Sequence, residues 1–431
     1  MKEDAEFIYE QVEKHHEWFK KSLPMIASEN IISPMARELL ISDFHDRYAE
    51  GPPGDRYYQG NIYVDEVELK AQELARDLFG AKYADVRPIS GTNANQAVLM
   101  GLGGPGKKIT AVDVSDGAHI SSAKFGSVGF RGMEPLTYPF NVDEMNIDVE
   151  GTKKMIKEEK PDIALFGRSV YMFPPPLEEL RDAFEEAGCY VWYDAAHVLG
   201  LIAGGEFQDP LREGVEIMTG STHKTLPGPQ RGILLSNPRD EEMKQKLFYG
   251  LFPGVLSNHH LHTMAALAVS LAEHQEFGKE YAKQIIKNAK ALGQALHERD
   301  IDVMCSHKGF TESHTLAIDV QKEGGGETLV EAMEEANMIA NKNLMPWDDV
   351  NSAKEPSGIR LGTQELTRLG MKESHMDEVG EFIKRIVKDD EDPNTVREDV
   401  VEFRDNFQEI HYCYKEGLPA HERFSFMDRY D

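Results

Sequence analysis

The sequence is poor in cysteine and in positive charge, and it lacks long apolar stretches. Its 431 residues include 3 cysteines, and 47 basic residues stand against 75 acidic ones, which gives a formal net charge of −28. The cysteines, Cys189, Cys305 and Cys413, lie far apart and form no CxxC pair, so no disulfide framework is expected. A reducing compartment, the cytoplasm, is therefore the expectation.

These shortages exclude several classes of protein. Phosphate backbones recruit basic faces, so the acidic balance argues against a nucleic-acid binder. No apolar run approaches the roughly 18 residues that span a bilayer, and the acidic start of the chain lacks the apolar core of a signal peptide. With 40% hydrophobic and 28% charged residues, the composition is that of a globular protein. Neither a membrane nor a nucleic acid is expected as a partner.

The pattern of apolar residues predicts an α/β fold. Short apolar segments alternate with helical ones, which predicts a mostly parallel sheet with helices on both faces and ligands at the carboxyl ends of its strands. The strands are expected at Ile109–Val112, Ile163–Phe166, Tyr190–Tyr193, Ile217–Thr219 and Ile233–Leu235. The helices among them are expected at Asn93–Leu102, Gly151–Glu158 and Leu177–Ala187.

Changes of pattern along the chain predict its domains. Gly and Pro breakers make residues 48–58 a loop at the end of an N-terminal arm. Beyond residue 272 a smaller α/β domain is expected, with a long helix at Tyr281–Asp300, and residues 389–396 read as an acidic linker. The predicted parts are an arm (1–56), a large domain (57–272), a small domain (273–390) and a C-terminal tail (391–431).

One lysine and one aspartate follow or end predicted strands. Lys224 lies in the loop Ser221-Thr-His-Lys-Thr-Leu-Pro-Gly-Pro-Gln230, where it is either a solvated surface lysine or a nucleophile that forms a Schiff base. Asp194 ends an apolar strand and is, on its own, equally well a helix cap. Pyridoxal phosphate needs a carboxylate beside its pyridine nitrogen, so the pair favours binding of this cofactor.

A third segment, Ser90-Gly-Thr-Asn-Ala-Asn95, is a small, hydroxyl-bearing turn that opens a helix. Its free amides and the helix dipole could hold an anion, although an ordinary capping turn has the same composition. Together with the lysine and the aspartate, the turn is interpreted as the cradle of the cofactor phosphate.

At this point the chain resembles the serine hydroxymethyltransferases, and among them the archaeal, methanogen-like branch. The resemblance covers nearly the whole chain, and the order of its motifs is far more specific than any one of them. The motifs are Ile26–Asn30, Arg47–Gly51, Arg56–Tyr58, Ser90–Gly91, Gly117–His119, Asp194–Leu201, Thr222–Thr225, Phe252–Gly254, Asn341–Asn343 and Ser357–Thr363.

The resemblance implies a fold-type-I pyridoxal-phosphate transferase that moves a one-carbon unit between serine and a reduced pterin, giving glycine. It implies that Lys224 carries the cofactor and that Asp194 pairs with the pyridine nitrogen. His119 would stack on the ring. The expected phosphate ligands are Ser90, Gly91, Thr92 and His223, and Ser169 and His197 would lie at the phenolic oxygen.

The resemblance also assigns the substrate side. Arg360 would clamp the amino-acid carboxylate through its planar fork, helped by Ser28. Glu50 and Tyr58 would handle protons on the substrate side chain, and together with Tyr48 they would reach into the partner subunit of an obligate homodimer. Contacts to the pterin would come from Val114, Ala118, Ile120 and Asn343.

The chain departs from the bacterial and eukaryotic pattern at four places. Thr92 replaces a serine, Gln230 stands where that pattern has an arginine and is followed by Arg231, and Ala118 replaces a glycine. A glycine-rich segment that feeds the neighbour's phosphate site is replaced by residues 254–260, where Asn258 is expected to take over the contact. The last two changes suggest tetrahydromethanopterin as an alternative to tetrahydrofolate.

Two other functions are compatible with part of this pattern. A threonine-aldolase-type lyase would share the lysine, aspartate and arginine but need no pterin, and a silent relative would bind without catalysis. The arm motif and Asn341–Asn343 favour the transferase. His259, His260 and His262 lack a nearby carboxylate or cysteine in sequence, so no metal site is expected there.

Overall fold

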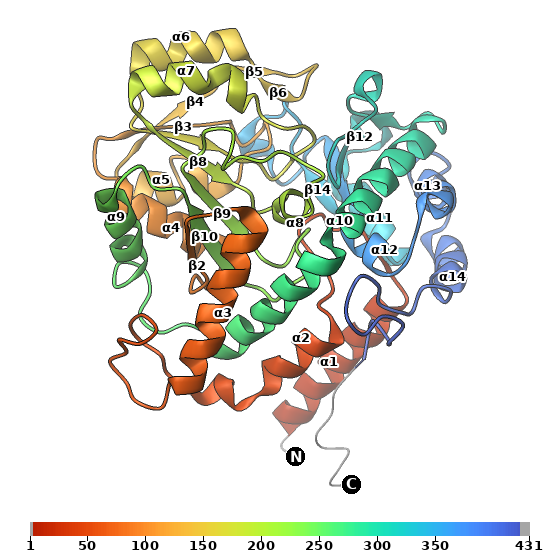
Figure 1. The fold of residues 1–431 in the computed structure, drawn as a ribbon. Helices are drawn as coiled ribbons and strands as arrows, with labels where there is room; N and C mark the ends of the chain where they lie inside the picture. Colours follow the sequence, from red (N-terminus) through yellow and green to blue (C-terminus); the bar gives the residue numbers. More distant parts are fainter. Residues whose placement is uncertain (1–2, 423–431) are drawn as a thin grey trace.

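The computed structural model describes residues 3–422 and has two α/β parts joined by one long helix (Figure 1). The larger part is built on a seven-stranded sheet in the order β2-β10-β9-β8-β7-β3-β4, in which only β10 runs antiparallel to its neighbours. Its strands are β2 Tyr83–Asp85, β3 Lys108–Ala111, β4 Glu134–Thr137, β7 Ile163–Phe166, β8 Tyr190–Asp194, β9 Ile217–Ser221 and β10 Gly232–Ser236. The mostly parallel sheet predicted from the sequence is confirmed.

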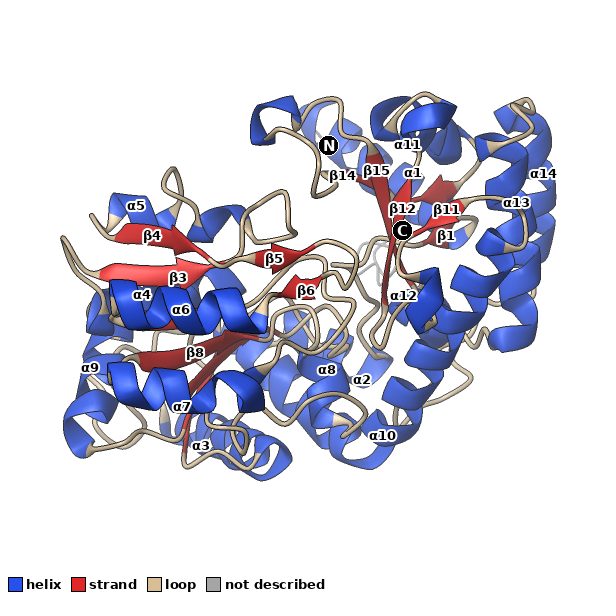
Figure 2. Cartoon of the chain, turned by 90° about the horizontal axis from the view of Figure 1, so that it is seen from above, coloured by secondary structure: helices blue, strands red, loops and turns tan. Residues whose placement is uncertain are grey.

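Helices cover both faces of this sheet, as Figures 1 and 2 show. Strands such as β7 and β9 are buried on both sides, as parallel sheets require. The helices of this part and of the arm are α1 Glu3–Lys20, α2 Pro34–Glu38, α3 Ile62–Phe79, α4 Gly91–Leu102, α5 Ser127–Phe130, α6 Val149–Glu159, α7 Leu177–Ala187, α8 Leu199–Ala203 and α9 Glu241–Leu251. A small hairpin joins β5 Phe140–Asn141 to β6 Asn146–Ile147.

The smaller part has an antiparallel sheet in the order β11-β12-β15-β14. Helices pack on one side of it and leave the other side facing the large part (Figure 2). The elements are β11 Asp302–Val303, β12 Thr315–Asp319, β14 Asn341–Asn343, β15 Gly358–Gly362, α11 Gly326–Glu335, α12 Gln364–Arg368, α13 Met376–Val387 and α14 Pro393–Arg404. A two-residue pairing of β1 Leu23–Pro24 with β13 Met338–Ile339 ties the arm to this part.

Two expected elements are wrong. The long helix starts at Leu261, not at Tyr281, and runs to His297 as α10, so the predicted boundary at 272/273 lies inside one helix. Its apolar stripe continues through both hydrophobic cores, and no proline interrupts it.

The expected acidic linker at 389–396 contains the start of helix α14. Asp392 caps this helix by accepting from the Asn394 amide, and Pro393 opens its first turn. Asp followed by Pro is a helix-start signal, which the acidic composition obscures. Val396 and Val400 then pack into the core of the small part.

No helix within residues 3–422 is long and apolar enough to cross a membrane.

Candidate active site

The lysine and the aspartate leave the same edge of the large sheet. β8 and β9 are parallel and pair Asp194 with Thr219, so Asp194 and the loop that follows β9 emerge together. The amino-terminal turn of α4 presses against this edge, because a Cβ on Gly91 would come within 2.3 Å of Ser221 Oγ. Only glycine fits this close approach.

Asp194 is held by one side chain and one amide. Its Oδ2 accepts from Asn95 Nδ2 at 2.7 Å, and its Oδ1 accepts from the Ala196 amide at 3.0 Å. Asn95 in turn accepts from Thr219 Oγ1 at 2.7 Å, and Thr219 accepts from Trp192 Nε1 at 2.9 Å. This buried chain fixes the direction in which the carboxylate points.

Lys224 loses its proton more readily than an ordinary lysine. Burial, and to a lesser extent the charge of Arg360, lower the pKa of its ammonium to about 8 although Asp194 opposes the shift. Its main-chain carbonyl accepts from Asn30 Nδ2 at 2.5 Å, which ties the lysine loop to the N-terminal arm. A lysine with a depressed pKa is a better nucleophile than a surface lysine.

The loop after β3 carries His119 and is joined to Ser169. The Ser169 amide donates to Gly117 O at 2.6 Å, and Gly117 has a φ of +94°, which favours glycine. His119 Nδ1 lies 2.8 Å from Ser121 Oγ. Burial lowers the pKa of His119, and the charges of Asp194, Lys224 and Arg360 also influence this pKa. The structure thus brings His119 to the lysine and the aspartate.

His197 is stacked on a second buried histidine. The rings of His197 and His314 are 5.6 Å apart and nearly parallel, and burial lowers the pKa of both, that of His314 to about 3. His314 Nε2 lies 3.0 Å from Ala27 O, an acceptor, so this nitrogen carries the proton. The neutral pair connects the loop after β8 to the segment that carries Ser28.

Arg360 is a buried cation without a counter-ion in the described chain. It lies on β15 with 8% of its surface exposed, donates from Nη1 to Ser169 O at 2.9 Å and from Nε to Asn341 Oδ1 at 3.2 Å. No ion pair within residues 3–422 involves it, and burial lowers its pKa to about 10, so it stays charged at neutral pH. A buried unpaired charge is costly and is satisfied by a ligand of opposite charge.

The start of α4 is arranged to receive an anion. Ser90 caps the helix by accepting from the Asn93 amide at 3.0 Å, and Gly91 and Thr92 form its first turn. Nearby on the lysine loop, His223 Nδ1 is buried with no hydrogen-bond partner in the described structure, and burial lowers the His223 pKa to about 4. A neutral imidazole with a free nitrogen can take part in binding the same anion.

The 48–58 loop, in contrast, lies apart from these residues. Glu50 and Tyr58 line a cleft with Phe252 and Pro253 whose lining includes neither the lysine nor the arginine. The Tyr48 and Tyr58 rings are 4.7 Å apart, and both are about half exposed. Within one chain, the structure does not bring these three side chains to the lysine.

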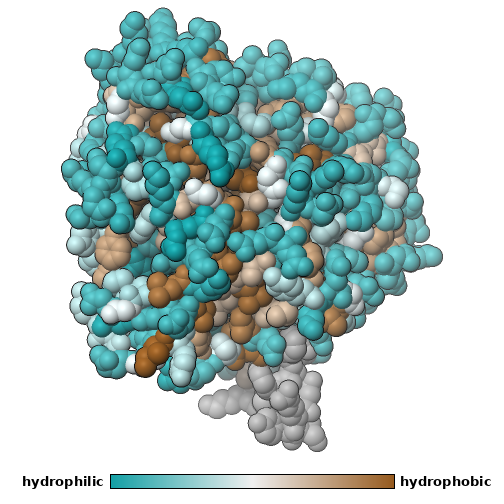
Figure 3. All heavy atoms as spheres, in the orientation of Figure 1, coloured by the Kyte–Doolittle hydropathy of each residue, from teal (hydrophilic) through white to brown (hydrophobic). Residues whose placement is uncertain are grey.

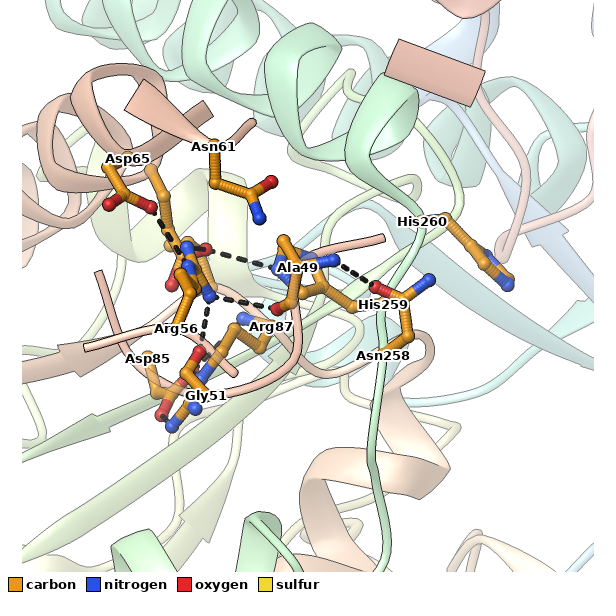
Figure 4. Close-up of polar contacts among 12 residues, drawn as sticks. Ala49, Gly51, Arg56, Asn61, Asp65, Asp85, Arg87, Asn258, His259 and His260 are labelled. Atoms are coloured by element: carbon orange, nitrogen blue, oxygen red, sulfur yellow. Dashed lines mark hydrogen bonds and ion pairs between the residues drawn. The ribbon is translucent and has the colours of Figure 1, made fainter. Parts of the chain in front are cut away.

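Asn258 contacts this loop and not the α4 turn. Its Oδ1 accepts from the Ala49 amide at 2.9 Å (Figure 4). The expected pterin contacts fall in two places: Val114, Ala118 and Ile120 lie around His119, and Asn343 lies on β14, two residues beyond the Arg360 partner Asn341.

The residues without an assigned role include two that hold others in place. Asn95 and His314 support Asp194 and His197, and sequence reasoning missed both roles. Asn95 stands one helical turn after Gly91, on the same face as the phosphate turn, and this spacing was a usable signal. His314 directly precedes β12, belongs to none of the motifs, and gave no signal.

The histidines near residue 260 contact different partners. Within residues 3–422, no three His, Cys, Asp or Glu side chains lie together in an arrangement that could hold a metal ion. His259 is buried against Glu68 and Arg231, and the rings of His260 and His262 are stacked 6.1 Å apart.

The chain is similar over nearly its full length to proteins of one family. A family model described as "Serine hydroxymethyltransferase" matches residues 1–383. Proteins named serine hydroxymethyltransferase from Picrophilus torridus, Methanocaldococcus jannaschii and Methanopyrus kandleri are 54%, 53% and 51% identical to it, over 96%, 95% and 97% of this chain and 96%, 96% and 97% of theirs.

The fold is that of a fold-type-I pyridoxal-phosphate enzyme. More narrowly, the chain belongs to the serine hydroxymethyltransferase family and is a transferase of that family.

Proposed function

We propose that the protein interconverts serine and glycine and transfers the one-carbon unit to a reduced pterin, either tetrahydromethanopterin or tetrahydrofolate. The observation that carries this is Arg360, a buried cation with no counter-ion in the described chain, in electrostatic range of Lys224. An amino-acid carboxylate is the ligand that satisfies it, and the planar guanidinium can bind this group bidentately.

The residues of the site fit pyridoxal phosphate. The free nitrogen of His223, the first turn of α4 at Ser90, Gly91 and Thr92, and the anchored Asp194 carboxylate match a phosphate at one end and a pyridinium at the other. When bound, this cofactor supplies an electron sink for bonds at the amino-acid Cα. His119 would pack on its ring, and Ser169 and His197 would lie at its phenolic oxygen.

Each remaining residue has a role in binding or proton movement. The Lys224 amine would hold the cofactor until the substrate amine takes its place. Its lowered pKa favours this exchange. Arg360 and Ser28 would orient the carboxylate. Glu50 and Tyr58 would hold or move the proton of the substrate hydroxyl, because this proton must leave when the serine Cα–Cβ bond breaks. Val114, Ala118, Ile120 and Asn343 would contact the pterin.

A homodimer completes this site, since Tyr48, Glu50 and Tyr58 do not reach the lysine of their own chain. An exposed apolar groove supports a second copy as the occupant: it is lined by Leu39, Phe44, Val67, Leu74 and Ala268 from the arm, α3 and α10. Figure 3 shows hydrophobic side chains gathered on the face where these helices lie. The three free, buried cysteines support a cytoplasmic location.

The test uses full-length protein loaded with pyridoxal phosphate and follows its visible absorption with glycine alone and with each pterin. A band that shifts to longer wavelength only when a pterin joins glycine supports the transferase, and the more effective pterin identifies the carrier. A coloured protein that is indifferent to every pterin but cleaves β-hydroxy amino acids would instead support the aldolase-type lyase. A colourless protein would contradict both.

A further inference from the structure

A chain of buried polar side chains runs beneath the 48–58 loop and ends at a strand of the large sheet. It consists of Arg56, Glu68, His259 and Arg231, and we call it the loop anchor. At most 4% of any of these side chains is exposed. These residues come from the loop, from α3, from the segment before α10 and from the position just before β10. None of these residues has been given a role in the candidate active site.

Arg231 is the fixed end of the loop anchor. Its Nη2 donates to Val86 O at 2.7 Å and Arg87 O at 3.0 Å, and its Nη1 donates to His260 O at 2.6 Å. These main-chain acceptors belong to the segment after β2 and to the start of α10. The guanidinium is therefore locked to the body of the large part.

His259 has its proton placed by its two partners. Its Nδ1 lies 3.2 Å from Arg231 Nη2, which can only donate, so Nδ1 is unprotonated. Its Nε2 lies 3.0 Å from Glu68 Oε2 and donates to that carboxylate. The neutral imidazole thus turns its lone pair toward the Arg231 cation and donates to the Glu68 carboxylate.

Glu68 passes the connection to the loop. Burial alone would raise the pKa of Glu68, but His259 and Arg56 outweigh burial and hold it below its ordinary value. Arg56 Nη2 donates to the same Oε2 at 2.6 Å, and Arg56 Nε donates to Asp65 at 2.8 Å. The carboxylate is therefore charged and holds both partners.

Arg56 grips the loop by its main chain. Its Nη1 donates to Ala49 O at 2.9 Å and also to Gly51 O, the two carbonyls that flank Glu50, as Figure 4 shows. The loop side chains cannot do this work, because Tyr57 and Tyr58 are 72% and 48% exposed. A loop whose side chains must stay free for a ligand is held by its backbone.

We propose that His259 is a positioning residue: through Glu68 and Arg56 it fixes the main chain on both sides of Glu50 and so sets where Glu50 and Tyr58 act. The inference deepens the proposed function and rests on it for the role of Glu50. Its structural half, that the loop anchor holds the loop, stands independently of which reaction is catalysed.

The experiment compares His259→Ala with the matched variant His260→Ala, whose side chain is exposed on the neighbouring residue. Backbone hydrogen exchange is measured on the full-length, cofactor-loaded protein. In His259→Ala, we expect amides of residues 48–58 to exchange about tenfold faster or more, since the loss of a charge-assisted hydrogen bond has about that effect. Amides of β8 and β9, and all amides of His260→Ala, should be unchanged.

Steady-state kinetics separates positioning from a merely structural role. For His259→Ala, kcat of the pterin-dependent reaction should fall about tenfold while KM for serine stays within about twofold, because Arg360 is untouched. Glu68→Gln keeps the size of the side chain and removes its charge, and it should show the same split. If His259→Ala does not fold, Glu68→Gln decides.

Unchanged exchange over residues 48–58 in both variants would overturn the inference, whatever the activity. Equal acceleration in β8 and β9 would overturn it too, because the loop anchor would then support the whole fold. If no pterin supports turnover, the proposed function fails, and the exchange measurement still decides whether the anchor holds the loop.

Discussion

The proposed site has two halves that are built differently. The strand-edge half consists of Asp194 at the end of β8, Lys224 just after β9 and Arg360 within β15. Hydrogen bonds with neighbouring groups fix the orientation of the Asp194 and Arg360 side chains. The loop half, Tyr48, Glu50 and Tyr58, sits on a segment without helix or strand whose main chain is gripped from below.

This difference corresponds to two kinds of task. Groups that hold a cofactor and a carboxylate need fixed positions, and rigid elements provide them. Groups that meet a large second substrate at a subunit boundary need exposed side chains, and a loop with an anchored backbone provides them. The predictions below test whether the two halves fail in different ways.

Lys224→Ala should give the largest effect, because it removes the nucleophile of the strand-edge half. We expect pterin-dependent turnover to fall by about a thousandfold or more. The protein should also lose the visible absorption of covalently held cofactor. Lys153→Ala, at an exposed lysine that pairs with Glu150 on α6, is the control and should behave as wild type. Retained turnover in Lys224→Ala would refute the assignment.

Arg360→Lys should separate charge from shape. The substitution keeps the positive charge and removes the planar fork, so KM for serine should rise by about a hundredfold, as expected for a buried hydrogen-bonded charge pair. The internal contacts to Ser169 O and Asn341 would be lost as well. Cofactor absorption without substrate should not change. A change in kcat alone would place the arginine elsewhere in the reaction.

The pH dependence of labelling should expose the lowered pKa of Lys224. With a pKa of about 8, about a tenth of the amine is free at pH 7, against well under a thousandth for an ordinary lysine near 10.4. In cofactor-free protein, its acylation rate, followed by mass spectrometry, should rise with pH and level off above about 8. Asp194→Asn removes a charge that raises this pKa, so the curve should move to lower pH. A rate still climbing between about pH 9 and 10 would contradict the assignment.

Local pattern made much of the fold predictable. The β/α alternation identified the parallel sheet, and α7 lies at the predicted residues. The reversed direction of β10 and the run of α10 through residue 272 were not predictable, because periodicity carries neither strand direction nor domain limits. In the site, the sequence motifs predicted residues such as Lys224 and Asp194, but no motif predicted His314. Its contact to Ala27 spans 287 positions and exists only in the folded chain.

Asn95→Ala should weaken the strand-edge half without dismantling it. Asp194 would lose a hydrogen bond at 2.7 Å but keep the one from the Ala196 amide. We expect kcat to fall about tenfold, with the free energy of unfolding reduced by about 1–3 kcal/mol because Thr219 also loses its partner. Asn95→Asp is the informative companion, since a second carboxylate beside Asp194 should be worse than alanine. Equal activity of wild type and alanine variant would show that Asp194 needs no support.

Asn258→Ala should have the smallest effect and decides to which half this residue belongs. In the structure its amide oxygen accepts from the Ala49 amide, which is one neutral hydrogen bond at the edge of the loop. Removing it should lower pterin-dependent kcat by only about threefold to tenfold, since such a bond contributes about 1 kcal/mol. If Asn258 instead served the neighbour's phosphate site, the variant would lose affinity for pyridoxal phosphate and keep its kcat at saturating cofactor. Measuring cofactor affinity and kcat on the same preparation therefore assigns Asn258 to the loop or to the strand edge.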